Sequence, residues 1–375
     1  MASESQVDSG DRSEPPPAKD PGGLLTSEHY WRDRQEWLEQ RGYMLRPRYR
    51  PDWKPSWEGN KKVWFVCEDG LYHDHPTVLD AIRISDNSVV TLKKISTTVH
   101  PHEIEIAQYL SSEPLSADPD NHCVPILEVL QDPHEENVAI LVMPLLRDCN
   151  DPEFHTFGEV VAFFHQLFHG LRFIHKQRVA HCDIMALNVM MDPMLLYPRL
   201  YHPINTHRNR DLTGNAKHFT RTERPPKYYY VDFGLSHKYD VDVSDPRVHP
   251  ILGGDKSVPE FQGEGYNQTW NPFKTDIYYL GNFIRQNFLK RYVGFEFMYP
   301  LIADMVQQDP DKRPTIEEVV DRFADVQARM SWWKLRSRLL QRDEPALFWG
   351  FRIFGHVFRT AKYVIKGLPP VPLPS

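Results

Sequence analysis

Short apolar runs dominate the chain up to residue 146 and predict a small antiparallel sheet. Five of these runs are rich in β-branched and aromatic residues and are bounded by turn-forming residues, as strands are. We expect strands at 61–69 (KKVWFVCED), 77–85 (TVLDAIRIS), 88–96 (SVVTLKKIS), 123–130 (CVPILEVL) and 137–146 (NVAILVMPLL). One helix, over 100–113, interrupts them: Pro101 suits its first turn, and Ile104, Ala107 and Leu110 share one face.

Helical periodicity surrounds this strand-rich part of the sequence. Residues 26–42 predict a helix with Thr26 or Ser27 as its cap and Gly42 at its end, which we expect to dock on the main domain. Its apolar stripe consists of Tyr30, Trp31, Trp37 and Leu38. Residues 156–177 predict a long amphipathic helix that begins with a capping box. The capping residues are Thr156 and Glu159, and the apolar stripe consists of Val160, Phe164, Leu167, Leu171 and Ile174.

Composition narrows the class of protein further. The chain has 375 residues, of which 41% are hydrophobic and 25% charged, as is typical of folded globular proteins. Its formal charge of −7 gives no positive field that would favour nucleic acid. Four cysteines without a CxxC pair encode neither a disulfide framework nor a zinc knuckle. Since residues 1–22 lack the apolar core of a signal peptide and no long uninterrupted apolar stretch follows, we expect an intracellular protein, cytoplasmic or nuclear.

Candidate chemistry is concentrated in motifs that follow one another along the chain. VVTLKKI carries Lys93 in a predicted strand, and the next predicted helix carries Glu103. HCDIMALN places Asp183 five residues before Asn188, and YVDFG delivers Asp232 at the end of a predicted strand. In this order and context the motifs resemble those of the protein kinase fold, with its V-A-I-K strand, helix Glu, H-R-D-x-x-x-x-N loop and D-F-G turn.

Three later motifs extend the resemblance. Val258-Pro259-Glu260 resembles the A-P-E end of an activation segment, and Asp276 in DIYYLG resembles the start of the large central helix. Arg313 in DPDKRPT is expected to pair with Glu260. Any one of these signals alone would be weak, but their order over residues 60–328 makes coincidence a poor explanation. The motifs and a long insert between them look like divergent kinase-like proteins of mushroom-forming fungi.

The resemblance implies an α+β fold with a small antiparallel β-sheet lobe that contains one key helix, and a larger, mostly helical lobe. The implied segments are a disordered tail (1–23), an extension helix and connector (24–58), the smaller lobe (59–147), the larger lobe (148–328) with an insert at 193–227, and a helical tail with a Pro-rich end (329–375). The tail is rich in Ser, Pro, Asp and Gly and offers little apolar surface to bury.

The resemblance also implies ATP and Mg²⁺ as cofactors and a role for each motif residue. Phosphoryl transfer depends mainly on positioning and on neutralising phosphate charge. Lys93 would hold phosphates and Glu103 would orient Lys93, while Asp183 would accept the proton of a substrate hydroxyl. Asp232 and Asn188 would bind Mg²⁺. The implied catalytic residues are Asp183, Lys93 and Asn188, and the implied nucleotide contacts are Lys93, Glu103, Val78, Met143, Leu146 and Asp232.

Three departures from the family pattern lower the expected activity. The stretch before Lys93 reads GLYHDHPTVLDA, so only Gly70 remains of the glycines that let a backbone approach phosphates closely. Cys182 replaces an Arg that usually grips a phosphate on the activation segment, which makes phosphorylation there a less favoured switch. Met185 replaces a Lys that steadies the transferred phosphate, and Leu187 supplies no substitute. Loss of such a cation costs ~10²-fold or more in rate.

The insert and the tails suggest partners. The basic insert at 193–227 is interpreted as a solvated loop packed on the larger lobe, or as a docking surface for an acidic partner. Residues 345–367 predict a basic amphipathic helix that either docks on the larger lobe or lies on an anionic membrane. Its apolar stripe consists of Leu347, Phe351, Phe354, Phe358, Ala361 and Ile365. The closing K-x-x-P-x-x-P, within 366–374, has the form of a ligand for an SH3-type partner.

Two functions from different classes compete. The first is an ATP-dependent phosphotransferase acting on protein Ser or Thr hydroxyls, favoured because Lys93, Glu103, Asp183, Asn188 and Asp232 are all present. The second is a pseudokinase that works as a scaffold, favoured by the missing glycines and catalytic-loop cations. A small-molecule kinase fits less well because the Pro-Glu and Arg-Pro motifs of protein kinases are present. No H-E-x-x-H or G-x-S-x-G occurs, which disfavours a zinc protease or a common hydrolase.

Overall fold

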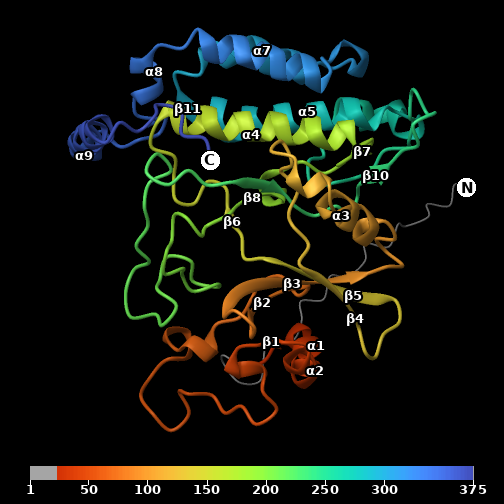
Figure 1. The fold of residues 1–375 in the computed structure, drawn as a ribbon, viewed down its shortest axis with the longest axis vertical. Coiled ribbons are helices and arrows are strands. Elements are labelled where there is room, and N and C mark those ends of the chain that lie inside the picture. Colours follow the sequence, from red (N-terminus) through yellow and green to blue (C-terminus); the bar gives the residue numbers. More distant parts are fainter. Residues whose placement is uncertain (1–22, 375) are drawn as a thin grey trace, which may run out of the picture.

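A five-stranded antiparallel sheet forms one end of the molecule, which a computed structural model describes for residues 23–374, apart from the side chains of 346–349 and 351 (Figure 1). The strands lie in the order β1-β2-β3-β5-β4. Their bounds are β1 Tyr43–Met44, β2 Val78–Arg83, β3 Ser88–Ser96, β4 Glu128–Gln131 and β5 Val138–Pro144. Four of the five predicted strands are confirmed, although β4 covers only the end of the run predicted for it. In the register of the sheet, Lys93 lies opposite Val78 and Leu141.

The predicted strand at 61–69 is wrong. Instead, the chain forms two 3₁₀ turns there, Trp64–Val66 and Glu68–Gly70. The Asp69 carboxylate accepts hydrogen bonds from Trp53 Nε1 and from the Ser56 amide and hydroxyl, so the segment folds back on itself rather than extending. One edge of the sheet is formed by the short β1, which lies in the segment 24–58 where only an extension helix and a connector were predicted.

Two short helices, α1 (His29–Arg32) and α2 (Gln35–Gln40), cover one face of the sheet. The single helix predicted for 26–42 is therefore broken. The break lies at Arg34, whose guanidinium reaches across to Asp132 beyond β4 with Nη2 3.0 Å from Oδ1. Trp31 and Leu38 pack against Leu79 and Leu92 in a core on this face, as the predicted docking requires.

α3 (Glu103–Ser111) lies on the other side of the sheet, between it and the long helices (Figure 1). The predicted face is confirmed for Ala107 and Leu110, which are buried. Ile106 rather than Ile104 occupies the third buried apolar position. Glu103, in the first turn, is buried as well, which is rare for a carboxylate without a partner.

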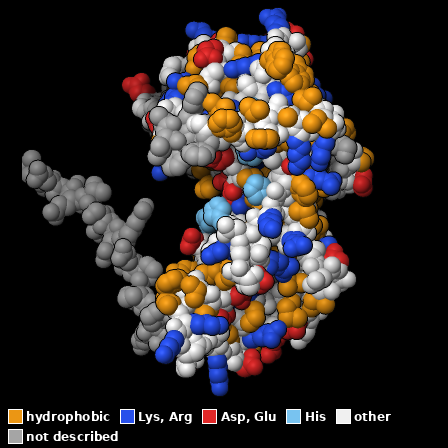
Figure 2. All heavy atoms as spheres, turned by 90° about the vertical axis from the view of Figure 1, so that its left-hand side faces the viewer, with side chains coloured by type: hydrophobic (Ala, Val, Ile, Leu, Met, Phe, Trp, Pro, Cys, Tyr) orange, Lys and Arg blue, Asp and Glu red, His pale blue; other side chains and the backbone are white. Residues whose placement is uncertain are grey.

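Helices make up the rest of the molecule. Their bounds are α4 Phe157–Lys176, α5 Pro272–Ile284, α6 Tyr299–Met305, α7 Ile316–Ala328, α8 Trp332–Arg336 and α9 Ala346–Ile365. Short paired strands join them: β6 Arg147–Asp148, β7 Val179–Ala180, β8 Val189–Met191, β9 Tyr228–Tyr230, β10 His237–Lys238, β11 Tyr292–Val293 and β12 Leu340–Gln341. Figure 2 shows the molecule narrowing between the strand-rich and the helix-rich parts.

α4 is the centre of the helix-rich part. Its predicted stripe is confirmed, since all five of those residues are fully buried in the larger core. Thr156 caps the helix by accepting the Glu159 N–H at 3.2 Å. Glu159 itself binds the His155 amide and Thr222 instead of closing the box.

The chain is thus an α+β protein over the residues described. Within that part, no helix has the length and apolar character needed to cross a membrane.

Candidate functional site

β3 and α3 bring Lys93 and Glu103 together. Because side chains alternate along a strand, Leu92 enters the core beneath α1 and α2 while Lys93 points to the opposite face, toward α3. Lys93 Nζ lies 2.5 Å from Glu103 Oε1 and 2.9 Å from Asp232 Oδ1. The Lys93 side chain is 16% exposed and that of Glu103 only 2%. Three residues predicted from separate motifs therefore form one ion cluster.

A left-handed turn after β9 delivers Asp232 to this cluster. The backbone φ at Asp232 is +64°, which is uncommon for a residue other than glycine. The turn is held by the Gly234 N–H, which donates to Asp232 Oδ1 at 3.2 Å. Gly234 O lies 2.9 Å from a ring nitrogen of His100, and this contact ties the turn to the segment before α3.

Asp183 and Asn188 are held in one loop. The Asn188 amide Nδ2 donates to Asp183 Oδ2 and to Asp183 O, both at 2.8 Å. The fully buried Asp276 on α5 accepts the N–H groups of His181 and Cys182, both at 2.8 Å, and so fixes the loop from below. Asp276 therefore supports the loop through the backbone of His181 and Cys182.

Pairing of β8 with β9 places the two halves of the site side by side. Val189 lies opposite Tyr230, and the Val231 N–H donates to Asn188 O at 3.0 Å. Asn188 is consequently adjacent to the residue that precedes Asp232. The loop with Asp183 and the ion cluster with Lys93 meet at this pair of strands.

Burial and neighbouring charges set the protonation of the cluster. Burial lowers the pKa of Lys93, but the carboxylates of Glu103 and Asp232 outweigh it and raise that pKa. Burial raises the pKa of Asp232, but Lys93 and the Gly234 N–H outweigh it and lower that pKa. Lys93 is thus a cation and Asp232 an anion at neutral pH. For Glu103, burial is the larger effect and raises its pKa.

Two glycines that the sequence analysis did not single out cover Asp183. The Gly254 N–H donates to Asp183 Oδ1 at 2.7 Å, so both carboxylate oxygens accept hydrogen bonds. A Cβ on Gly253 would overlap the Asp183 carboxylate, and a Cβ on Gly254 would overlap the Met185 thioether. Glycine at both positions lets the backbone approach these side chains without displacing them. The adjacent glycines Gly253 and Gly254 are the sequence feature that could have indicated this close approach to Asp183.

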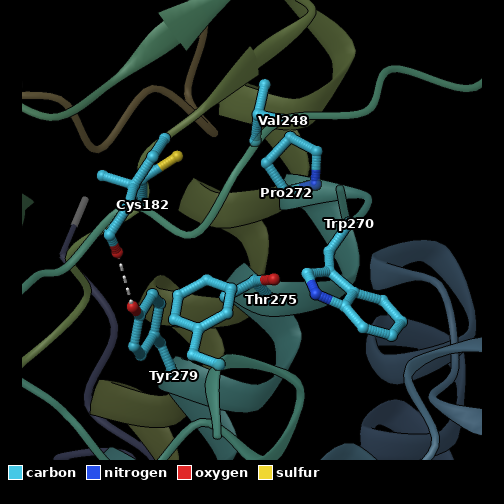
Figure 3. Close-up of a pocket in the computed structure, with 8 residues that line it drawn as sticks. Cys182, Val248, Trp270, Pro272, Thr275 and Tyr279 are labelled. Atoms are coloured by element: carbon cyan, nitrogen blue, oxygen red, sulfur yellow. Dashed lines mark hydrogen bonds between the residues drawn. The ribbon is translucent and has the colours of Figure 1, made fainter. Parts of the chain in front are cut away.

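Cys182 lies at a small cavity instead of a charged site. Figure 3 shows Cys182, Val248, Pro272, Trp270, Thr275 and Tyr279 around this cavity. Its volume is about 10 Å³. Val248 and Trp270 exchange backbone hydrogen bonds of 3.0 and 2.8 Å, and Tyr279 Oη donates to Ile251 O at 3.5 Å. Burial raises the pKa of the Cys182 thiol well above its usual value, so the thiol is not activated as a nucleophile.

The predicted pair of Glu260 and Arg313 is confirmed. Arg313 Nη1 and Nη2 bind Glu260 Oε1 and Oε2 at 2.8 and 2.6 Å, in a bidentate arrangement. Both side chains are almost completely buried, at 0% and 1% exposed. Thr275 on α5 donates a further hydrogen bond to Glu260 at 3.0 Å. The pair therefore joins the Pro259–Phe261 turn, α5 and the segment before α7.

Gly70 does not belong to a phosphate-binding turn. It packs against Trp64, where an added Cβ would overlap the backbone carbonyl. The long segment 45–77, which joins β1 to β2, contains the stretch where the resemblance implies a run of phosphate-binding glycines. Val78, by contrast, lies beside Lys93 in the sheet.

A charged network runs from this segment to the insert. Asp80 lies on the same face of β2 as Val78, and its Oδ1 is 3.2 Å from Arg46 Nε. Arg46 Nη1 is 3.5 Å from Glu68 Oε1, and Glu68 Oε1 is 3.6 Å from His202 Nε2 in the insert. These contacts join residues that lie far apart in the chain, so no local sequence pattern predicts them.

Met143 and Leu146 lie at the junction of the two parts, and both are half-buried. Met143 is opposite Thr91 in the sheet. Leu146 O accepts a 3.4 Å hydrogen bond from the Tyr201 hydroxyl of the insert. Leu196 and Tyr197 anchor the insert in the larger core, as the simpler interpretation of this segment requires.

Asp232 and Asn188, the residues expected to bind Mg²⁺, supply only part of the ligands that this ion needs. Asp232 and Asn188 offer oxygen atoms, which Mg²⁺ prefers. Over the part of the chain that the structure describes, no group of three or more His, Cys, Asp or Glu residues is arranged to hold a metal ion. A magnesium ion here would depend on phosphate oxygens and water for its remaining ligands, as is common for nucleotide-bound magnesium.

No protein-family model matches the chain, and no curated protein is significantly similar to it.

Proposed function

We propose that the protein is a kinase-like phosphotransferase that uses ATP and Mg²⁺ to phosphorylate Ser or Thr hydroxyls of proteins. One observation carries the proposal: Lys93 Nζ lies 2.5 Å from Glu103 Oε1 and 2.9 Å from Asp232 Oδ1. Binding of a metal-bound polyphosphate needs a cation for the phosphates and a carboxylate that can reach the metal. Lys93 provides the ammonium, the buried Glu103 orients it, and the partly exposed Asp232 provides the carboxylate. The order of the motifs, which resembles that of protein kinases, supports the same conclusion.

Each residue has a chemical task in this proposal. Lys93 would bind phosphate oxygens as a point charge, and Glu103 would keep it pointing into the site. Asp183 would orient a substrate hydroxyl and accept its proton, while Asn188 keeps one carboxylate oxygen of Asp183 in place. Bound Mg-ATP would supply the transferable phosphoryl group and the metal charge that neutralises it, held by Asp232 and Asn188.

A pseudokinase that acts as a binding module is the second candidate. Two observations favour it: the expected phosphate-binding glycines before Lys93 are missing apart from Gly70, and both carboxylate oxygens of Asp183 already accept hydrogen bonds. The side chain at 185 is a thioether rather than a cation. Such a molecule would retain the buried ion pairs and use its surface segments for binding.

Point variants distinguish the two candidates. We would measure magnesium-dependent ATP turnover and phosphate transfer to generic protein substrates for the wild type, Lys93→Met, Asp183→Ala and Lys94→Met. Lys94 is the matched control, because it points to the other face of β3 and lies over the Tyr30 ring. The enzyme hypothesis expects a rate loss of ~10²-fold or more for the first two variants and little change for Lys94→Met.

Equal rates in all four proteins would exclude the enzyme. A thermal shift with Mg-ATP tests binding separately from chemistry. A shift that Lys93→Met abolishes, together with equal rates, would support a nucleotide-binding pseudokinase.

A further inference from the structure

Helix α9 turns its apolar side outward. Of its predicted apolar stripe, Phe354 is 69% exposed, Phe358 76% and Ile365 85%. Val357 and Val364, on the same side of the helix, are 57% and 49% exposed. For the residues whose side chains are described, the predicted stripe is therefore not the side that holds α9 on the molecule. A contiguous exposed apolar surface of this kind marks an interaction site.

The opposite side of α9 holds the helix on the molecule. Tyr363 is 1% exposed, and its hydroxyl donates to Thr220 Oγ1 at 2.8 Å. Lys362 Nζ lies 2.5 Å from Glu223 Oε1. Thr220 and Glu223 belong to the insert, so α9 is fixed against the insert through polar contacts. This orientation leaves the apolar side facing solvent.

The segment after α9 reinforces this orientation. Val371 packs against the larger core, Pro372 is buried, and an added Cβ on Gly158 would overlap the Pro370 carbonyl. The K-x-x-P-x-x-P stretch is therefore packed on the molecule itself. An SH3-type partner would first have to displace it, so this stretch does not explain the exposed side of α9.

The charge around the exposed side is positive. Residues 345–374 contain Arg352, Arg359, Lys362 and Lys366 but no Asp or Glu. Arg352 and Lys362 have glutamate partners, at 3.1 and 2.5 Å, yet remain 48% and 53% exposed. Lys362 and Lys366 lie on the flank of the helix between Phe358 and the docked Tyr363, while Arg352 and Arg359 lie nearer to Tyr363. Figure 2 looks at the side of the molecule that carries α9 and shows hydrophobic side chains next to Lys and Arg side chains.

We infer that α9 binds the surface of an anionic phospholipid membrane. Phe354, Phe358 and Ile365 would enter the boundary between headgroups and acyl chains, and the neighbouring cations would meet headgroup phosphates. A second copy of the chain fits this surface less well, because a symmetric contact would bring the same cations together without any acidic residue of the helix between them. This inference goes beyond the proposed function and does not depend on it.

Vesicle binding by the full chain tests the inference. We would measure flotation with vesicles of phosphatidylcholine alone and of phosphatidylcholine with a minority of phosphatidylserine. We expect binding to the anionic vesicles only, weakened as salt shortens the Debye length from about 10 Å to about 3 Å. The double variant Phe354→Ser/Phe358→Ser should lower the partition coefficient by about tenfold or more. Since both side chains are exposed, its melting temperature should stay close to that of the wild type.

Matched controls separate α9 from exposed apolar residues elsewhere. Val241→Ser and Val99→Ser change side chains that are 88% and 67% exposed outside α9, and both variants should bind as the wild type does. Lys366→Glu should weaken binding to anionic vesicles. No binding of the wild type, equal binding to both kinds of vesicle, or unchanged binding of the double serine variant would overturn the inference. Self-association without vesicle binding that the double variant abolishes would assign the surface to a second copy instead.

Discussion

The carboxylates around the site differ in their surroundings rather than in their chemistry. Asp276 is fully buried, accepts the backbone N–H groups of His181 and Cys182 and contacts the His175 ring, which suits a support. Glu103 is buried against a cation. Asp232 is 44% exposed beside the same cation, and so can reach a ligand. The sequence marks Glu103, Asp183, Asp232 and Asp276 by their motifs, but the division of roles depends on burial that only the folded chain shows.

Adding one carbon atom at Gly253 tests whether this segment positions the Asp183 carboxylate. The variant Gly253→Ala should shift the segment away from Asp183, because its new Cβ would overlap the carboxylate. Under the proposed function we expect the phosphotransfer rate to change by about tenfold or more. Gly214→Ala, in a half-buried turn of the insert where an added Cβ would come no closer than 3.4 Å to Asn209, is a neutral control. An unchanged rate in an active protein would show that this contact does not position Asp183.

His122 gives the molecule a predictable dependence on pH. Burial lowers its pKa to about 4, and Nδ1 lies 2.8 Å from Tyr228 O on β9. The ordinary pKa of a histidine is about 6.5, so His122 of the unfolded chain binds a proton below that pH. In the folded chain His122 stays neutral until the pH falls to about 4. The free energy of unfolding should therefore fall as the pH drops from 6.5 to 4, by about 3 kcal/mol from this residue alone.

The variant His122→Asn isolates that contribution. Asn retains an N–H donor for Tyr228 O but does not titrate. Urea unfolding at a series of pH values should show a shallower loss of stability in acid for the variant than for the wild type. Parallel curves for the two proteins would mean that other groups cause the whole acid dependence.

The helices and strands that could be predicted are those in which apolar positions repeat regularly along the whole element. β3 and α4 have repeating apolar positions over nine and twenty residues, and burial of a whole face fixes such elements. The segment 61–69 has a strand-like composition but is shaped by Asp69 and its hydrogen bonds to distant residues. The helix at 26–42 was predicted from its stripe, whereas its break depends on the contact of Arg34 with Asp132. Long-range polar contacts of this kind leave no periodic signal.

The Glu260 and Arg313 pair holds three elements together and should matter for stability. Glu260→Ala would leave a buried guanidinium without its partner, which costs about 3–5 kcal/mol. Lys312→Met is the control, since its ion pair with Asp309 has a separation of 3.7 Å and Lys312 is 71% exposed. We expect that control to change stability by less than about 1 kcal/mol. Chemical denaturation measures both, and a small loss for Glu260→Ala would contradict this account.

At the scale of the whole molecule, polar contacts connect the strand-rich and helix-rich parts on more than one side. His100 meets Gly234 O behind the site, and Tyr201 meets Leu146 O at the junction. Glu68 and His202 connect the segment 45–77 to the insert. Neither of these two segments follows the resemblance to protein kinases, so their contact was not predictable from it.

The contact of Glu68 with His202 allows the coupling between the segment 45–77 and the insert to be measured. His202 Nδ1 accepts the N–H groups of Ile204 and Asn205, which leaves Nε2 to face Glu68. His202→Asn keeps an acceptor for those groups but cannot reach Glu68. Because a partly exposed pair at 3.6 Å contributes little energy, we expect amide exchange around 68–71 to rise only about two- to fivefold, without a change in global stability.

A second variant makes this test specific. If the two segments are coupled through this pair, His202→Asn should have no further effect on amide exchange in a Glu68→Gln background. His207→Ala, an exposed histidine in the same insert, should leave exchange around 68–71 unchanged in either background. Additive effects of His202→Asn and Glu68→Gln would show instead that each residue supports its own segment, and that the two parts of the molecule are joined only at their other contacts.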